Sequence, residues 1–568
     1  MYGLYCFMTN SLVLADFIVF IFYFIIVAFY GYWIYNRKKK ITTDTKDFFL
    51  AEGSLTWWAI GASLIASNIS AEQFVGMSGD GFFIGIGIAV YEWLAAISLV
   101  IIAVWFIPVY LKNKIYTMPQ FLKMRYNETV ALIMAIIWLF LYVFVNLTSI
   151  LYLGSVAING LAGGEYLHEI MIGLAIFALI ITLGGMKVIG YTDVIQVAVL
   201  IIGGIATTYL ALSIVGEKLG EGNSIVQGFK ALMKNAPDHF HMILQKPTAA
   251  SPQIEIDKYL ILPGIAMYYA GQWIGNLNYW GCNQYITQRA LGADLKTART
   301  GLLFASFLKL FMPVIVMLPG IAAYVLYKNG HLPHLVGGKD GAYSAILAFL
   351  PNGLKGLSIA ALTAAIVASL AGKANSISTI YILDIHKRYF NKAAGEKRMV
   401  ALGRFTVIVA MLIAIIFTWE DTLGIGGKGG FTFIQKYTGY ISPGVFAMFI
   451  LGMFWKRTTG AAAIAGVISG FLLCIVFNNY APTWFGNETW LYTAYLNSQG
   501  VYEIPFLLSM GYSFFITVGL MVLMSLAGPK INAKAFHFDK DMFKLEPSSI
   551  AMIVTLLIML SLLYVRFW

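Results

Sequence analysis

Charged residues are scarce in this sequence. Asp, Glu, Lys and Arg make up 11% of its 568 residues, whereas hydrophobic residues make up 59%. Soluble domains contain about 25% charged residues. The composition therefore excludes a large soluble protein, and no soluble signalling domain is seen in the sequence.

Motifs of enzymes and cofactor proteins are also missing. The three cysteines, Cys6, Cys282 and Cys474, have the spacing of neither a disulfide framework nor a metal site. No cluster of His, Cys and Asp has metal-ligand spacing. The sequence contains neither a phosphate-binding P-loop nor a Gly-x-Ser-x-Gly elbow. We therefore expect no enzyme activity and no cofactor.

Long apolar runs dominate the sequence instead. A run of about 20 residues can cross a bilayer core, and in lipid it must be helical because its backbone has to satisfy its own hydrogen bonds. We predict an all-α polytopic membrane protein with about 14 transmembrane helices. The predicted spans are 12–35, 57–79, 84–109, 129–156, 169–186, 189–215, 259–286, 300–327, 353–383, 401–418, 437–454, 459–480, 506–527 and 548–566.

The basic residues fall mainly in alternate loops between these runs. The first run is followed at once by Arg37 to Lys40 and has no positive charge before it, so it should stay as a helix rather than act as a secretory signal. The positive-inside rule explains the net charge of +11 without nucleic-acid binding. An even number of spans then places both termini outside, in a plasma (inner) membrane protein.

The long outer loop, 216–258, contains an amphipathic pattern. Its apolar residues Ile225, Phe229, Leu232 and Met233 share one face at helical spacing. The pattern predicts a short helix, which either forms a lid or rests on the membrane surface. The second interpretation is favoured.

Two of the predicted spans contain polar or glycine-rich interruptions. The run 57–79 is interrupted at Ser67 to Ser70, and the run 259–286 at Gly271, Gly275, Asn276 and Asn278. Each run opens a stretch of about five spans, and paired interruptions at matching places indicate a transporter binding site.

Ionisable residues inside predicted spans point to function, because a charge in the membrane is costly. They are Glu72, Glu92, Asp193 and Lys309, which are too scattered for a catalytic pair. Unwinding at 66–69 would free carbonyl oxygens for a hard cation such as Na⁺. Ala365 and Ser369 share a helix face and form either a second part of that site or a tight packing seam. From the residues alone the seam is favoured.

Several amides and one carboxylate lie on the same spans, near aromatic residues. Each buried amide needs a partner, and for any single one an interhelical hydrogen bond is the simpler explanation. Taken together, the set favours a site for a hydroxyl-rich solute whose ring stacks on an aromatic face. The polar residues are Asn68, Gln73, Glu92, Asn276 and Gln435, and the aromatic ones are Tyr91, Tyr279, Trp280 and Phe431.

Longer stretches carry a resemblance to a known family. They are WWAIGASLIASNISAEQFVGMSG at 57–79, YEW at 91–93, FVNLTSILYLG at 144–154, TDVIQV at 192–197, YWGCNQYITQR at 279–289, AALTAAIVASL at 360–370 and QKYTGYISPG at 435–444. Over nearly its whole length the chain resembles the sodium/solute symporter family of the sodium/glucose symporter type, and within it the bacterial sodium/galactose symporters.

The resemblance implies two inverted five-helix repeats of the leucine-transporter type. It divides the chain into an N-terminal extra helix and inner loop (1–56), a first repeat (57–215), the outer loop (216–258), a second repeat (259–456) and C-terminal extra helices (457–568).

The resemblance also implies the site residues. Sodium would bind the main-chain carbonyls of Ala66, Ile69 and Ala365 and the hydroxyl of Ser369, and it would leave past Asp193. The family commonly has a second hydroxyl where this chain has Ala368. The sugar site would consist of Asn68, Gln73, Glu92, Asn276, Lys309, Gln435 and Tyr279. Tyr279 resembles the inner gate, and Met77, Tyr91 and Phe431 resemble the outer lid.

The expected function is secondary active transport: symport of sodium and a neutral monosaccharide, glucose or galactose, by alternating access. The galactose branch has serine at Ala95 and an aromatic residue at Asn278, so the preferred sugar stays open. The expected partners are the sodium ion, the monosaccharide and the lipid bilayer, with no nucleic acid. The alternatives are another small solute (a polyol, a sialic acid or an amino acid), a membrane sensor or a passive channel.

Overall fold

The structure of the chain is a computed structural model. It describes residues 13–37, 56–161, 165–183, 186–248, 250–332, 335, 338–393, 395–425 and 429–568. Within these ranges the only β-strands are β1 (Tyr495–Leu496) and β2 (Tyr502–Glu503), which pair antiparallel. The prediction of a helical protein is therefore confirmed for the described part of the chain.

The described residues contain 11 helices that are long and apolar enough to cross a membrane. Each falls on one of the predicted spans. The elements that build them are α1 (Leu14–Arg37), α5 (Val90–Ile101), α6 (Ile107–Lys112), α8 (Glu128–Phe140), α9 (Thr148–Leu161), α11 (Met186–Lys218), α17 (Leu295–Val316), α18 (Leu318–Lys328), α20 (Leu354–Thr379), α21 (Glu396–Thr418), α22 (Gly430–Phe454), α23 (Gly460–Ile475), α25 (Phe506–Leu526) and α26 (Pro547–Phe567).

The other three predicted spans differ from these. The run 169–186 corresponds to α10 (Leu167–Leu183), an apolar helix of shorter length. The runs 57–79 and 259–286 are each divided into several short helices. The total of about 14 spans therefore stays a prediction.

The first division lies where the sequence predicted it. Helix α3 (Trp57–Asn68) ends before Ile69, whose backbone is extended with φ −81° and ψ 120°, and the chain resumes as the π-helix η2 (Glu72–Met77) and α4 (Ser78–Phe83). The side-chain oxygen of Gln73 accepts from the Ser70 N–H at 2.9 Å, and the Ser70 hydroxyl accepts from the Glu72 N–H at 3.2 Å. Polar side chains thus replace the helical bonds at the break.

The second division lies elsewhere than predicted. Gly271 to Cys282 form one continuous piece, α15 (Gly271–Leu277) followed by the π-helix η7 (Asn278–Cys282). The breaks are at Ala270, after α14 (Ala266–Tyr269), and at Asn283, before α16 (Gln284–Leu291). The prediction that the run 259–286 is broken is confirmed, but Gly275, Asn276 and Asn278 lie within a continuous helical piece. Gly271 directly follows the break at Ala270 and packs closely against another segment. A Cβ there would lie 2.4 Å from the Leu507 carbonyl oxygen.

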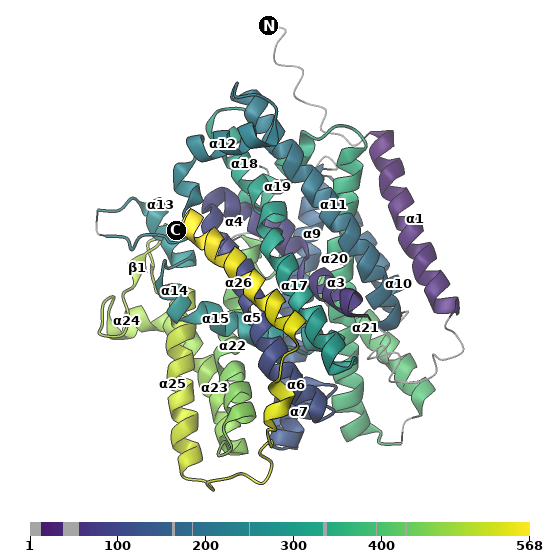
Figure 1. Cartoon of the computed structure of the whole chain (residues 1–568), viewed down its shortest axis with the longest axis vertical. Helices are drawn as coiled ribbons and strands as arrows, with labels where there is room; N and C mark the ends of the chain where they lie inside the picture. Colours follow the sequence, from purple (N-terminus) through teal and green to yellow (C-terminus); the bar gives the residue numbers. More distant parts are fainter. Residues whose placement is uncertain are drawn as a thin grey trace.

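The broken helix α3 lies at the centre of the bundle. It packs against α11, α17 and α20, while α22 packs against α23, α25 and η2. Figure 1 shows α1 along one edge of the bundle, α23 and α25 at the opposite lower edge, and α26 crossing the front obliquely. The two breaks are therefore surrounded by protein, as irregular backbone at membrane depth must be.

Both described ends of the chain lie at the face that carries the 216–258 segment. Asp16 at the start of α1 accepts from the Gly353 and Gly356 N–H groups at 2.7 and 2.9 Å. The Met242 N–H donates to the Phe567 carbonyl at 2.7 Å. The shared face agrees with an even number of spans. That this face lies on the outer side of the membrane stays a prediction.

The amphipathic helix predicted in the 216–258 segment is present as α12 (Ile225–Asn235). It packs against α11 and α18, with Gly228, Ala231 and Leu232 buried. Leu232 belongs to the predicted apolar face, whereas Ile225 of the same face is exposed. The face therefore rests mainly on the protein itself.

Candidate functional site

A cavity lies between the two broken helices. The volume that is open to the centres of water molecules is about 80 Å³. A single water molecule needs about 10–15 Å³ of such volume. All seven residues predicted to bind the solute line it, and they come from α3, η2, α5, α15, η7, α17 and α22. These residues are Asn68, Gln73, Glu92, Asn276, Tyr279, Lys309 and Gln435. The fold thus brings together residues up to 367 positions apart in sequence (435 − 68).

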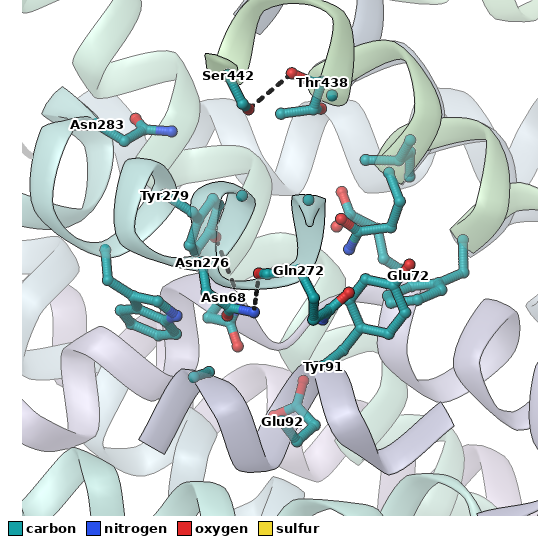
Figure 2. Close-up of a pocket in the computed structure, with 18 of the residues that line it drawn as sticks. Asn68, Glu72, Tyr91, Glu92, Gln272, Asn276, Tyr279, Asn283, Thr438 and Ser442 are labelled. Atoms are coloured by element: carbon teal, nitrogen blue, oxygen red, sulfur yellow. Dashed lines mark hydrogen bonds between the residues drawn. The ribbon is translucent and has the colours of Figure 1, made fainter. Parts of the chain in front are cut away.

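A chain of polar contacts crosses the cavity from α5 to η7. The Lys309 ammonium donates to the Glu92 carboxylate and to the Asn68 side-chain oxygen. The Asn68 amide in turn donates to the Tyr279 hydroxyl at 3.3 Å, the bond drawn in Figure 2. Lys309 is 1% exposed and its ammonium lies 5.2 Å from the centre of the Trp280 ring. A buried charge needs such partners. These polar contacts therefore fix the end of α3 beside the second broken helix.

The two glutamines of the predicted site differ in their contacts. Gln73 holds the first break through Ser70, as described above. Gln435 lies on α22 at the wall of the cavity. Gln73 therefore links the cavity to the break, whereas Gln435 forms part of the cavity wall.

Two of the predicted outer lid residues meet over the cavity. The rings of Tyr91 and Phe431 lie edge to face with centres 5.0 Å apart, and both line the cavity. Phe431 lies directly on Gly76, where a Cβ would come within 2.7 Å of the Phe431 backbone nitrogen. Met77, the third predicted lid residue, is buried in η2 and is not among the residues that line the cavity.

The first break releases carbonyl oxygens of the predicted cation site. In a continuous helix the Ser70 N–H would bond to the Ala66 carbonyl, and the Gln73 N–H to that of Ile69. Here they bond to Gln73 Oε1 at 2.9 Å and to the Ser70 carbonyl at 3.2 Å. Carbonyl and hydroxyl oxygens are the ligands that hard cations prefer. The donor set therefore fits a sodium ion.

Helix α20 carries the other two predicted cation ligands and packs against α3. The Ser369 hydroxyl donates to the Ser67 carbonyl at 3.2 Å, and it lies 3.3 Å from the Tyr285 hydroxyl. Ala365 is buried one turn before Ser369. Ala368, where the family commonly has a hydroxyl, is also buried on α20.

Asp193 lies next to the same helix α3. The Ser63 hydroxyl donates to the Asp193 carboxylate at 2.6 Å, and Arg289 approaches that carboxylate at 3.7 Å and donates to Ser63 at 2.9 Å. The Ser67 hydroxyl bonds to the Ser63 carbonyl at 2.6 Å. A row of oxygen atoms thus runs from Ser369 through Ser67 and Ser63 to Asp193.

Several residues that line the cavity were not predicted from the sequence. The most important is Lys373 on α20, whose ammonium lies 3.3 Å from the Glu72 carboxylate. A lysine inside a predicted span was a signal that could have found it. The other polar ones, some of them labelled in Figure 2, are Asn146, Gln272, Asn283, Thr438 and Ser442.

The chain is similar to proteins of known function over its whole length. It is 40% identical to a sodium/glucose cotransporter of Vibrio parahaemolyticus, over 98% of this chain and 99% of that protein. It is 32% identical to sodium/myo-inositol cotransporter 2 of Mus musculus, over 84% of this chain and 71% of that protein. It is 31% identical to sodium/glucose cotransporter 1 of Mus musculus, over 81% of this chain and 71% of that protein.

A solved structure shares the fold. It is the substrate-bound outward-open state of a Na⁺-coupled sialic acid symporter, with a TM-score of 0.74 at 19% identity, over 92% of this chain and 99% of that one. The family model described as "Sodium:solute symporter family" matches residues 48–470. The chain is an integral multi-pass membrane protein that belongs to the sodium:solute symporter family and couples solute transport to sodium.

Proposed function

We propose that this symporter carries a neutral monosaccharide, glucose or galactose, together with sodium. One observation supports this most: the charged side chains that line the cavity are already paired with one another. Lys309 is paired with Glu92, and Lys373 with Glu72. A buried charge left without a partner is costly, so a solute with its own net charge would have to break a pair.

The uncharged lining suits a sugar. Amide and hydroxyl groups from several helices can donate to and accept from ring hydroxyls, and the Tyr279, Trp280 and Tyr91 rings offer flat faces. A sialic acid, by contrast, carries a carboxylate that would compete with Glu92 or Glu72 for a lysine. An amino acid presents both charges but few hydroxyls.

Coupling follows from the position of the proposed sodium site. Sodium bound by the carbonyls of Ala66, Ile69 and Ala365 and by the Ser369 hydroxyl would tie the break to α20. The same break carries Asn68 and Gln73, so ordering it would complete the sugar site. Each sodium ion that enters adds about 2.3 kcal/mol per 100 mV of membrane potential.

In the proposed cycle, sugar binding closes the Tyr91 and Phe431 lid from outside. The two repeats, 57–215 and 259–456, then rock about the bound ligands, as in transporters of the leucine-transporter type. The sugar leaves past Tyr279 and sodium leaves past Asp193. The protein would do this in the inner membrane, with both termini outside.

A cyclic polyol is the second candidate. The observation that favours it is the 32% identity with sodium/myo-inositol cotransporters, together with Ala95 in the cavity wall. Losing one hydroxyl at position 95 relaxes the demand for a particular sugar hydroxyl.

The test is uptake of labelled solutes into proteoliposomes. Glucose, galactose, myo-inositol, a sialic acid and an amino acid are offered in turn, with an inward sodium gradient or with potassium in its place. We expect glucose or galactose to accumulate above equilibrium only with the sodium gradient. Accumulation of myo-inositol alone would favour the polyol, and equal equilibration in potassium would indicate a passive channel.

A further inference from the structure

Lys373 and Glu72 form a buried ion pair at the cavity. Lys373 lies on α20 and is 3% exposed, and Glu72 opens the π-helix η2 and is 7% exposed. Their charged atoms are 3.3 Å apart, and both residues line the cavity. The pair therefore connects α20 directly to the segment that follows the first break.

This connection runs parallel to the one expected from sodium. Lys373 is four residues, one helical turn of about 6 Å, after Ser369 on α20. Glu72 is three residues after Ile69, and its N–H is bonded to the Ser70 hydroxyl. Sodium and the ion pair would thus hold the same two elements together, side by side.

Tyr285 joins the two positions. Its hydroxyl lies 3.3 Å from the Ser369 hydroxyl, and the Lys373 ammonium lies 5.3 Å from the centre of its ring. Gly372 allows this packing, because a Cβ there would lie 2.9 Å from the Tyr285 ring. The ammonium is therefore held in place near the proposed sodium site.

A fixed positive charge at this distance opposes the binding of a second cation, and a fixed negative charge favours it. Inside a protein these effects are large because little water screens them. From this arrangement we propose that Lys373 and Glu72 set the sodium affinity of the transporter. The Lys373 ammonium neutralises part of the attraction that the Glu72 carboxylate exerts on sodium. Sodium binding therefore stays weak enough for the ion to be released inside.

The inference rests on the proposed position of the sodium site but not on which solute is carried. Its test is therefore read without solute. Purified protein is titrated with sodium at constant ionic strength, with potassium as the replacing ion. Thermal stability and intrinsic tryptophan fluorescence report binding, because a ligand of the folded state raises stability with its concentration.

The variants are Lys373→Met, Glu72→Gln and the double variant. We expect Lys373→Met to tighten sodium binding by about tenfold or more and Glu72→Gln to weaken it by a similar factor. The double variant should return close to the original affinity. A purely structural pair would instead give losses in both single variants, so opposite signs with cancellation are the signature of the proposed role.

Two further variants complete the design. If Lys373→Met does not fold because it leaves Glu72 buried and unpaired, Lys373→Gln removes the charge while its amide can still donate to Glu72. Lys234→Met, which removes an exposed lysine paired with Glu221, should leave sodium affinity unchanged. Shifts of the same sign in both single variants, no shift, or no stabilisation by sodium would overturn the inference. Failure of the unaltered protein to transport a sugar, with these shifts present, would overturn only the proposed solute.

Discussion

The Ser369 hydroxyl donates a hydrogen bond of 3.2 Å to the main-chain carbonyl of Ser67, across the contact between α20 and the end of α3. A side chain of α20 thus touches the backbone of α3 close to the point where that backbone leaves the helix. The Ser369 oxygen therefore lies at the first break, where we propose that sodium binds.

Replacing Ser369 by Ala removes this hydroxyl from the proposed sodium site. We expect the sodium concentration for half-maximal uptake to rise about tenfold, the loss typical of one ligand or hydrogen bond to an ion. Sodium-dependent uptake in proteoliposomes measures it. Ser155→Ala is the matched control, because the buried Ser155 hydroxyl bonds only to its own helix, at the Leu151 carbonyl. An unchanged sodium dependence in Ser369→Ala would remove Ser369 from the site.

Gln435→Ala and Gln73→Ala should both weaken sugar binding, but in different ways. Gln435 lines the cavity on α22, so its loss should raise the sugar Kd about tenfold through missing hydrogen bonds and leave sodium binding nearly unchanged. Gln73 also holds the Ser70 N–H, so its loss should weaken sodium binding as well. Equilibrium binding of labelled sugar and a sodium titration separate the two effects. The exposed Gln499→Ala should change neither, and identical effects of the two glutamines would contradict their assignment.

The Lys309–Glu92 pair allows a test that separates stability from recognition. Removing one partner, as in Glu92→Gln or Lys309→Met, should cost about 3–5 kcal/mol because a buried charge stays unpaired. The double variant should recover much of the free energy of unfolding but not sugar binding. Thermal unfolding and sugar binding measure the two quantities. Full sugar affinity in the double variant would exclude this pair from the binding site.

A pH dependence is expected at Asp340, whose carboxylate accepts from the first residue of α22. Burial raises the pKa of Asp340 to about 6, although Lys339 and the Gly430 N–H, which donates to Asp340 at 2.8 Å, lower it. In the unfolded chain the pKa is about 3.9, so the folded protein binds the proton more tightly. This contribution to stability is present in full below about pH 4 and is lost as the pH rises through 6.

We therefore expect the melting temperature to fall between about pH 5 and about pH 7.5 more steeply in the original protein than in Asp340→Asn, which cannot titrate. Thermal unfolding across this range in both proteins measures it. Parallel curves would show that Asp340 does not titrate there.

The lid depends on a glycine. A Cβ at Gly76 would lie 2.7 Å from both the backbone nitrogen and the Cβ of Phe431, so Gly76→Ala should push the start of α22 away and slow sugar uptake. Gly173→Ala is the matched control within a helix, because among the described residues no atom outside its own helix would lie within 4 Å of an added Cβ. Equal uptake by both variants would show that close contact between η2 and Phe431 is not needed.

Much of this molecule could be predicted from local sequence. Apolar length predicted the spans, because lipid requires continuous helices there. The break before Ser70 was also predictable, since Ser70 and Gln73 can bond to nearby backbone groups in place of the helix. In each case the residues that carry the signal lie close together in the sequence.

Contacts between distant segments were not predictable in the same way. Gly271 resembled a helix breaker, but its partner is the Leu507 carbonyl, far along the chain. The pairing of Lys373 could not be predicted from local sequence, because its partner, Glu72, lies 301 residues away. The resemblance to a family grouped the seven predicted solute-binding residues, all of which line the cavity, but it did not include Lys373.

We propose above all that sodium orders the sugar site at the first break. The most direct measurement is the Kd of glucose and galactose for the purified protein, by titration calorimetry in sodium and in potassium, with the reciprocal sodium titration in saturating sugar. We predict that sodium lowers the Kd of the sugar and that saturating sugar lowers the Kd of sodium by the same factor. Equal sugar affinity in sodium and potassium would contradict the account.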